Sequence, residues 1–216
     1  MRRLVVATRN PAKAGEMSVI LHELLPDWRV LSLADFPEFD EPEETGETYA
    51  ENAIIKAEAA RDSLSPLPLG EDRPGAAVDG GEGDLYFVAD DAGLEIDAMG
   101  GAPGVKSKRF AGEHSPFSEK ISLILSHLQG RPTGERTARF HCAVAIAKPD
   151  RTVVFEAAKE GVICETPRGD RGFGYDPIFY LPELEKTYAE LDPAHKNVIS
   201  HRGIVLREAA AWLSSL

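Results

Sequence analysis

The chain has few cysteines and no long apolar run. Its 216 residues include two cysteines, Cys142 and Cys164, whose spacing fits neither a metal site nor a disulfide framework. Both lie in apolar stretches, so we expect both to be buried and reduced. No stretch approaches the roughly 18 to 20 apolar residues that cross a bilayer. The apolar run after Arg2 and Arg3 is too short for a signal peptide, so we expect a cytoplasmic protein with no membrane partner.

Basic residues are also scarce. The 24 Lys and Arg face 36 Asp and Glu, which gives a formal net charge of −12. Non-specific nucleic-acid binding depends on a basic surface, so we expect no nucleic-acid partner. A phosphate ligand is compatible with this charge if a local basic pocket or a divalent cation offsets the repulsion. With 43% apolar residues, the chain is of a size and composition that bury a core of their own.

Two common phosphate-binding motifs are missing, because the sequence contains neither GxxxxGK[ST] nor GxGxxG. In their place stands ATRNPAKAGE, where an apolar strand (residues 3–7) leads into a helix expected from about 12 to 25. Amide groups at the start of this helix, with Lys13 nearby, would form an anion site. For this stretch alone, an ordinary strand-to-helix turn is an equally good interpretation.

The pattern of elements predicts an α/β fold with a mixed, twisted sheet, since helices and strands alternate early and a long hairpin follows. Thr48 and Glu51 fit a capping box at the start of the second helix. The Pro- and Gly-rich stretch of about residues 63–84 is expected to be a surface insertion in a single domain, 1–216. Further strands are expected at 29–33, at 85–90 and on both sides of the turn KPDR, and further helices up to about 61, at 116–128 and at 200–216.

The stretch YFVADDAGLEIDAMGG places two adjacent carboxylates, Asp90 and Asp91, at the expected end of an apolar strand. Side chains alternate along a strand, so only one of the pair can face the core. At the carboxyl end of a strand in an open α/β sheet, the other would point to where ligands bind. Paired carboxylates suit acid–base catalysis or Mg²⁺, although a polar turn explains them equally well.

Three further segments carry candidate binding groups, each with a plainer alternative. The stretch EPEETGETYAENAIIKAE is best explained, by itself, as a solvated acidic loop and an exposed helix face that carries Asn52 and Lys56. RGDRGFGYDPIF offers two rings for stacking and a carboxylate that can accept hydrogen bonds, or is a structural glycine-rich turn. HKNVISHRG gathers basic groups that suit a phosphate or a carbonyl oxygen, or is a basic helix start.

Together, these segments resemble the Ham1/inosine triphosphate pyrophosphatase family. The matching segments follow the family's order over almost the whole chain: VVATRNPAKAGE, EETGETYAENAIIKA, VADDAGLEIDAMGGAPGVKSKRFAGE, ARFHCAVA, GFGYDPIF and KNVISHRG. The resemblance implies an elongated mixed sheet flanked by helices, with two lobes and a central substrate cleft. It also implies a homodimer that uses Mg²⁺ to hydrolyse dITP/ITP and XTP/dXTP to the monophosphate and pyrophosphate.

The resemblance also implies roles for single residues. Asp91 would be the catalytic base and a metal ligand, and Glu43 the other ligand, supported by Glu44, Glu51, Lys56 and Asp90. The substrate would contact Thr8, Arg9, Asn10, Pro11, Ala12 and Lys13 with its phosphates, and Phe173, Gly174, Tyr175, Asp176, Lys196, His201 and Arg202 with its base and sugar. Ala92 stands where many relatives have serine, so only a backbone contact with the substrate would remain there.

Two alternatives stay open. One is a Maf-like pyrophosphatase with a different base preference, which a substrate profile would distinguish. The other is a nucleotide-binding protein of the same fold that catalyses nothing. The presence of both Asp91 and Glu43 argues against the second alternative.

Overall fold

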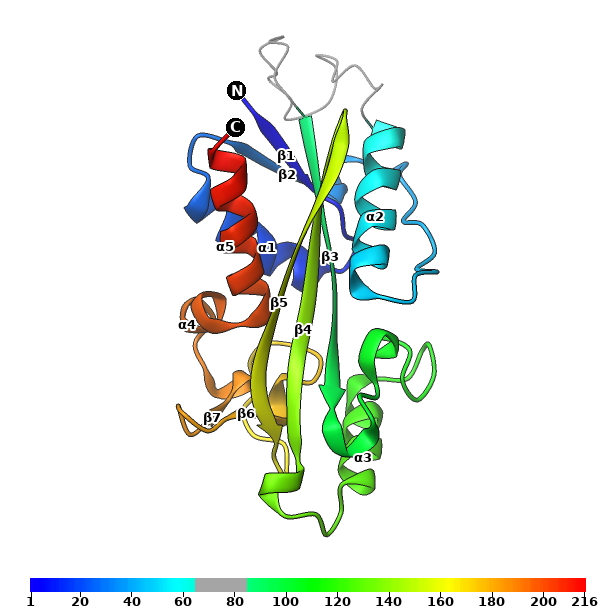
Figure 1. Ribbon diagram of the computed structural model, residues 1–216, viewed down its shortest axis with the longest axis vertical. Helices are drawn as coiled ribbons and strands as arrows, with labels where there is room; N and C mark the ends of the chain where they lie inside the picture. The colour runs from blue at the N-terminus through cyan, green and yellow to red at the C-terminus, as the bar shows by residue number, and fades with distance from the viewer. Residues whose placement is uncertain (65–84) are drawn as a thin grey trace. The chain divides into compact units, whose positions relative to one another are not determined.

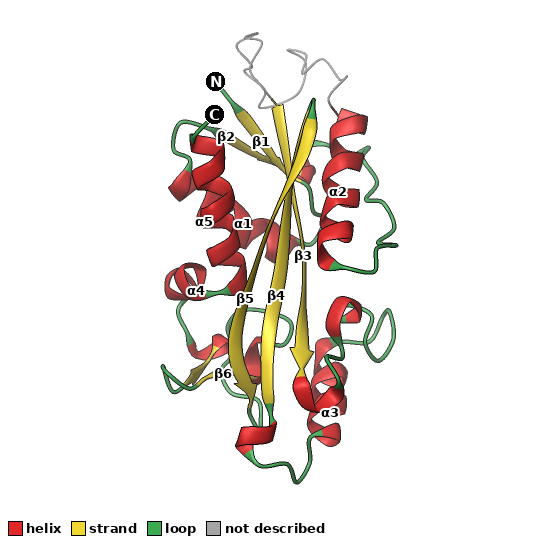
Figure 2. Ribbon diagram, in the orientation of Figure 1, coloured by secondary structure: helices red, strands yellow, loops and turns green. Residues whose placement is uncertain are grey.

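The computed structural model describes residues 1–64 and 85–216. Within these residues, seven strands form one mixed sheet in the order β2-β1-β3-β4-β5-β6-β7. The strands are β1 (Arg3–Val6), β2 (Arg29–Ser32), β3 (Leu85–Ile96), β4 (Thr137–Lys148), β5 (Arg151–Ile163), β6 (Phe179–Leu181) and β7 (Lys186–Thr187). The helices are α1 (Pro11–Leu24), α2 (Tyr49–Leu64), α3 (Phe117–His127), α4 (Pro193–Ile199) and α5 (His201–Ser214) (Figure 2). The predicted α/β class is confirmed.

The chain divides into two compact units. Unit 1 consists of Met1–Asp90, Val144–Phe155 and Leu206–Leu216, and unit 2 of Asp91–Ala143 and Glu156–Val205. The division therefore falls inside β3, between Asp90 and Asp91. The predicted insertion at about 63–84 lies outside the described residues, apart from its first two residues, which belong to α2.

In unit 1, β1 pairs in parallel with β2 on one side and with β3 on the other, so that Leu4 lies opposite both Val30 and Tyr86. Parallel strands are usually covered on both faces, which explains why β1 is apolar after Arg3 and why Leu4, Val5 and Val6 are each 0% exposed. Figure 1 shows α2 on one side of these strands and α5 on the other. The helix predicted from about 12 to 25 is present as α1, and it buries Met17, Ile20 and Leu21.

Unit 2 has a core of its own. Ile121 and Ile124 of α3 pack in one cluster with Phe179 and Leu181 of β6 and with Tyr188. β5 continues the sheet into β6 by antiparallel pairing, and β6 continues it into β7 in the same way. The predicted hairpin is confirmed, because the turn at 149–150 joins β4 directly to β5.

The structure corrects several local expectations. β3 does not end at Asp90 but continues to Ile96, because Leu94 and Ile96 are buried apolar positions that extend the strand past the two aspartates. α4 occupies a stretch without a predicted helix, and it begins at Pro193 because the side chain of Asp192 accepts the N–H of His195. α2 extends beyond its expected end near 61, to Leu64.

Two other expectations concern the cysteines and the membrane. Cys142 and Cys164 are both thiols, but only Cys142 is buried as expected; Cys164 is half-buried, next to the loop that follows β5. None of the helices in the described ranges is long and apolar enough to span a bilayer.

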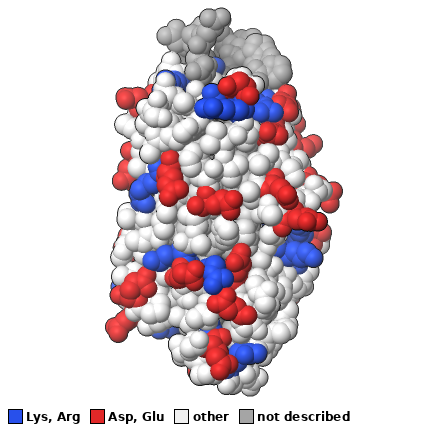
Figure 3. All heavy atoms as spheres, viewed as in Figure 1, with Lys and Arg blue, Asp and Glu red and all other residues white. Residues whose placement is uncertain are grey.

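Charged side chains of both signs are interspersed on the face drawn in Figure 3. In unit 2, ion pairs also link neighbouring strands. Arg139 of β4 lies 2.9 Å from Glu160 of β5, and its guanidinium group also lies 3.1 Å from Asp97. Such exposed pairs contribute little stability, so they leave the packing of the core to determine the fold.

Two helical glycines should respond in opposite ways to the same substitution. A Cβ atom on Gly203 would lie 1.8 Å from the carbonyl oxygen of Asn197, so Gly203→Ala should destabilise the protein by about 1–3 kcal/mol. A Cβ atom on Gly15 of α1 would meet nothing within 4 Å, so Gly15→Ala should stabilise it by about 0.5–1 kcal/mol. Urea unfolding of the two variants measures both effects, and equal shifts would contradict the close approach at Gly203.

Candidate active site

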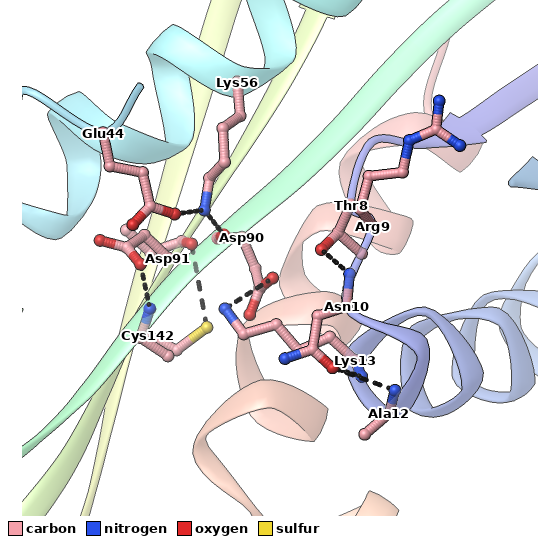
Figure 4. Close-up of polar contacts among 12 residues, drawn as sticks. Thr8, Arg9, Asn10, Ala12, Lys13, Glu44, Lys56, Asp90, Asp91 and Cys142 are labelled. Carbon is pink, nitrogen blue, oxygen red and sulfur yellow. Dashed lines mark hydrogen bonds and ion pairs between the residues drawn. The ribbon is translucent and has the colours of Figure 1, made fainter. Parts of the chain in front are cut away.

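Unit 1 contains a compact cluster of two lysines and two carboxylates (Figure 4). The Nζ atom of Lys13, on α1, lies 3.2 Å from Oδ1 of Asp90, on β3. The Nζ atom of Lys56, on α2, lies 2.9 Å from Oε1 of Glu44 and donates to the main-chain carbonyl of Asp90 at 2.5 Å. Asp90 is 0% exposed, and the ammonium group of Lys13 gives its buried carboxylate a partner of opposite charge.

Side chains at the start of α2 hold the preceding loop in place by hydrogen bonds. The Oδ1 atom of Asn52 accepts the N–H of Gly46 at 2.8 Å, and Thr48 and Glu51 form the predicted capping box. Asn52 and Lys56 share one face of α2, as their spacing predicts, but that face is buried and not solvated. The expectation of an exposed helix face is therefore wrong, because Lys56 is directed at Glu44 and Asp90.

The turn between β1 and α1 uses its amide groups within the protein. Oδ1 of Asn10 accepts the N–H groups of Ala12 and Lys13, at 3.0 and 3.2 Å, and caps α1. Oγ1 of Thr8 accepts the N–H of Asn10 at 3.2 Å, and Pro11 has no N–H to give. The predicted anion site made of helix amides is therefore not preformed, and Lys13 remains the group of this turn that is suited to an anion.

Arg9 also differs from its predicted role as a phosphate ligand. Its guanidinium group donates to main-chain carbonyls of Leu33 and Phe36, each at 2.8 Å. In Figure 4 this side chain points away from the cluster of Lys13 and Asp90. Arg9 therefore contacts the segment after β2.

Asp91 begins unit 2 and is 6% exposed. Its Oδ1 atom accepts the N–H of Ala92 at 3.0 Å, so the amide predicted to meet the substrate already has an acceptor in the protein. Of the two glutamates predicted near the metal, Glu44 is the one that contacts Lys56, whereas Glu43 is exposed. The role of Glu43 as a ligand stays a prediction.

In unit 2, the carboxylate of Asp176 holds the loop Phe173–Asp176 in place. Asp176 is 3% exposed, and its Oδ2 atom lies 2.5 Å from Nζ of Lys196 and accepts the N–H of Phe173 at 2.8 Å. A Cβ atom on Gly172, which has a φ of +71°, would lie 2.1 Å from the same Oδ2 atom. Glycine is therefore required at 172, and Oδ2 of Asp176 binds the loop itself where we expected it to bind a ligand.

The two rings of this loop have different environments. Tyr175 is 3% exposed, and its hydroxyl group donates to the carbonyl of Ser107 at 2.9 Å; burial raises the pKa of this hydroxyl. Its ring meets Phe117 of α3 edge-on, with centroids 5.1 Å apart. Tyr175 thus anchors the loop and does not offer a stacking surface. Phe173 is only half-buried and is the ring suited to a planar ligand.

Two of the three predicted basic groups lie beside this loop. Nζ of Lys196 lies 4.9 Å from the centroid of the Phe173 ring, and Cζ of Arg202 lies 5.5 Å from it. His201 is stacked on Phe140, with ring centroids 4.6 Å apart and an angle of 13° between the rings. The structure therefore brings together Phe173, Asp176, Lys196 and Arg202, and it places His201 next to Arg202 at the start of α5.

Sequence reasoning missed the residues that support these groups. Phe140 and Ser107 carry no functional signal of their own, since one belongs to an apolar strand and the other to a loop. The aromatic residue in ARFHCAVA could have been noted, because alternation along the strand places Phe140 on the inner face of β4. Nothing in the sequence pairs Ser107 with Tyr175.

The acidic groups of the site do not make a ready-made metal cage. Across residues 1–64 and 85–216, no three His, Cys, Asp or Glu side chains lie together as ligands for a metal ion. The predicted ligands Glu43 and Asp91 are carboxylates, which are the ligands that Mg²⁺ takes. Mg²⁺ typically binds through one or two carboxylates and the phosphates of a substrate, so the donor set fits this ion.

These features define a mixed α/β protein with a lysine–carboxylate cluster in one unit and a glycine-rich loop flanked by cations in the other. The chain belongs to the Ham1 family, whose family model matches residues 4–212.

Relatives and solved structures agree with this assignment. A dITP/XTP pyrophosphatase of Geobacillus kaustophilus is 47% identical over 95% of this chain and 91% of the relative. One of Bacillus subtilis is 41% identical over 100% of this chain and 98% of the relative. The structure of a HAM1 protein from Coxiella burnetii has a TM-score of 0.81 and 37% identity, and covers 100% of both chains.

The ion pair of Asp176 and Lys196 should show strong coupling when it is broken. Both side chains are at most 5% exposed, so Asp176→Asn leaves a buried lysine without its partner charge and should cost roughly 3–5 kcal/mol. Lys196→Met added to Asp176→Asn should recover about 2 kcal/mol of that loss, because the buried charge is removed. Thermal and urea unfolding of both single variants and the double variant measure the coupling. Additive losses would show that the pair is solvated and worth little.

Proposed function

We propose that this protein hydrolyses dITP/ITP and XTP/dXTP to the monophosphate and pyrophosphate. The observation that carries the proposal is the cluster of Lys13, Lys56, Glu44 and Asp90. Asp90 directly precedes Asp91 in the chain. Membership of the Ham1 family supports it, as does the identity of 41% and 47% to two proteins named dITP/XTP pyrophosphatase.

The lysines would bind the phosphate chain. Each ammonium group is already held in place by a carboxylate, Lys13 by Asp90 and Lys56 by Glu44. Lysine is a compact charge with three N–H donors, so it can bind a phosphate oxygen while it stays beside its carboxylate. The two lysines would also stabilise the negative charge that develops on the leaving pyrophosphate.

The cluster also explains why a cation would be required. Two lysines and two carboxylates sum to no net charge, and Asp91 makes the local balance negative before a triphosphate arrives. We propose that Asp91, with a carboxylate of the Glu43 and Glu44 pair, holds Mg²⁺. When bound, Mg²⁺ would neutralise phosphate charge and polarise the phosphorus that is attacked.

Asp91 would act as the general base. A water oxygen forms a bond to phosphorus, its proton passes to the Asp91 carboxylate, and the bond between the α- and β-phosphoryl groups breaks. The hydrogen bond from the Ala92 amide at 3.0 Å holds this carboxylate in one orientation. The protein supplies the base and the substrate supplies the leaving pyrophosphate, so the reaction needs no covalent enzyme intermediate.

The base of the substrate would be recognised in unit 2. Phe173 offers a partly exposed ring, and Lys196 and Arg202 carry donors beside it. Inosine and xanthine have a carbonyl group at C6 where adenine has an amino group. A site of fixed donors therefore leaves adenine's amino group facing another donor, and a buried mismatch of this kind discriminates strongly.

Pyrophosphate release from dITP, XTP, dGTP, dATP and dTTP tests the proposal. With Mg²⁺, we expect dITP and XTP to be preferred over dATP by about a hundredfold or more in kcat/KM, and no turnover with EDTA. Asp91→Asn should lower kcat by about a thousandfold without loss of folding, because the base and a metal ligand are removed.

Asp150→Asn is the matched control, since this aspartate sits in the exposed turn of the hairpin and pairs with Lys148 at 3.0 Å. It should leave turnover unchanged. A flat profile, or a preference for pyrimidine nucleotides, would overturn the proposed substrate. Substantial turnover by Asp91→Asn would overturn the role of Asp91.

We also propose that the protein works as a homodimer, which the resemblance to its family implies, and that it is located in the cytoplasm. Multi-angle light scattering of the purified chain should give twice the mass of 23.5 kDa. A single-chain mass at micromolar concentration would contradict the dimer, and recovery in a membrane or secreted fraction would contradict the location.

A further inference from the structure

Arg9 makes an unusual set of contacts for a residue in a strand-to-helix turn. Its guanidinium group donates to the carbonyls of Leu33 and Phe36 at 2.8 Å, of Pro37 at 3.3 Å, and of Phe39. Arginine has five N–H donors in a rigid planar fork, which is what allows one side chain to collect several carbonyls. These carbonyls all belong to residues 33–39, which begin with the 3-10 turn η1 (Leu33–Asp35).

The main chain of Arg9 also contacts this segment, at a second point. Its N–H donates to Oε1 of Glu41 at 2.7 Å. Three residues further on, Glu44 pairs with Lys56, which also donates to the carbonyl of Asp90. The segment 33–44 is therefore attached at its start by Arg9 and at its end by Lys56.

Charge explains why this attachment matters. The sequence EFDEPEETGE carries six carboxylates, which repel one another in a stretch with no helix or strand of its own. Within this stretch no lysine or arginine occurs, and the guanidinium group of Arg9 reaches its start through the main-chain carbonyl of Phe39. Hydrogen bonds from a charged donor are stronger than those from a neutral donor. Arg9 therefore restrains the segment 33–44 against the mutual repulsion of its carboxylates.

We propose that Arg9 is a positioning residue, which holds the acidic segment so that Glu44 remains at Lys56 and Asp90. Arg9 acts through the loop and not by touching phosphate. The effect on turnover rests on the proposed function, because Glu44 and Lys56 belong to the cluster that would receive the phosphates and Mg²⁺. The contact of the loop with Arg9 itself rests on geometry alone.

Two substitutions distinguish positioning from phosphate binding. Arg9→Lys keeps the charge but loses the fork, and Arg9→Met keeps the length but loses the charge. If Arg9 positions the loop, both variants should raise the Mg²⁺ concentration for half-maximal turnover by about tenfold, with kcat more affected than KM. If Arg9 binds phosphate, Arg9→Lys should remain close to wild type and only Arg9→Met should raise KM; that result would overturn the proposal.

Hydrogen–deuterium exchange supplies a readout that needs no turnover. Peptides that cover residues 33–44 should exchange faster in both Arg9 variants, by about tenfold, while the core of unit 2 stays protected. Arg131→Lys is the matched control, because Arg131 forms one exposed ion pair with Glu135 at 3.4 Å and should leave exchange and turnover unchanged.

The outcomes separate this proposal from the proposed function. If the wild-type protein turns over no nucleotide, the proposed function fails, and faster exchange at 33–44 still establishes that Arg9 holds the segment. If the wild type is active and Arg9→Met leaves both exchange and Mg²⁺ dependence unchanged, the role of Arg9 is overturned while the function stands.

Discussion

A charged carboxylate inside a strand is the constraint on which unit 1 depends. Asp90 is 0% exposed, and an ionised group in such a place costs several kcal/mol unless other charges and donors replace its water. Lys13 supplies the opposite charge from α1, and Lys56 covers the carbonyl of the same residue from α2. The positions of α1 and α2 are therefore both tied to the need to stabilise the buried Asp90 of β3.

This requirement also changes how an anion would be recognised. The amides at the start of α1 are used by Asn10, so the turn does not resemble a phosphate loop in which the backbone binds the ligand. Recognition must come from side chains that are held ready by carboxylates of the protein. In such an arrangement the internal ion pairs keep the lysines in place, and little reorganisation is needed when a more highly charged partner arrives.

Much of the fold follows from local sequence signals, and the exceptions have physical causes. The first helix, the capping box at Thr48 and the hairpin around KPDR are local patterns, and they are present as predicted. The continuation of β3 could not be predicted, because Ala92 and Gly93 favour no strand and only the neighbouring strands sustain it. α4 was missed because its seven residues carry no apolar stripe and bury only Lys196.

The contacts of the candidate site were harder to predict from the sequence than the fold. Its residue types could be identified, but their partners are distant in the chain. Arg9 meets carbonyls 24 to 30 residues away, and Tyr175 meets a carbonyl 68 residues away. No periodicity encodes such contacts. Asp176 and Asn10 are similar cases, since each is a plausible ligand by type and each binds its own backbone in the structure.

The division of the chain has a consequence for how the protein is made. Unit 1 needs residues 144–155 and 206–216 in addition to its first 90 residues, and unit 2 is interrupted by the first of these segments. During synthesis, the first 90 residues are therefore followed by residues 91–143 of unit 2, and the edge of β3 stays unpaired until β4 is made. Neither unit corresponds to a continuous fragment. A fragment cut within residues 91–205 would lack part of each unit and expose strand edges, so we expect no such fragment to fold by itself.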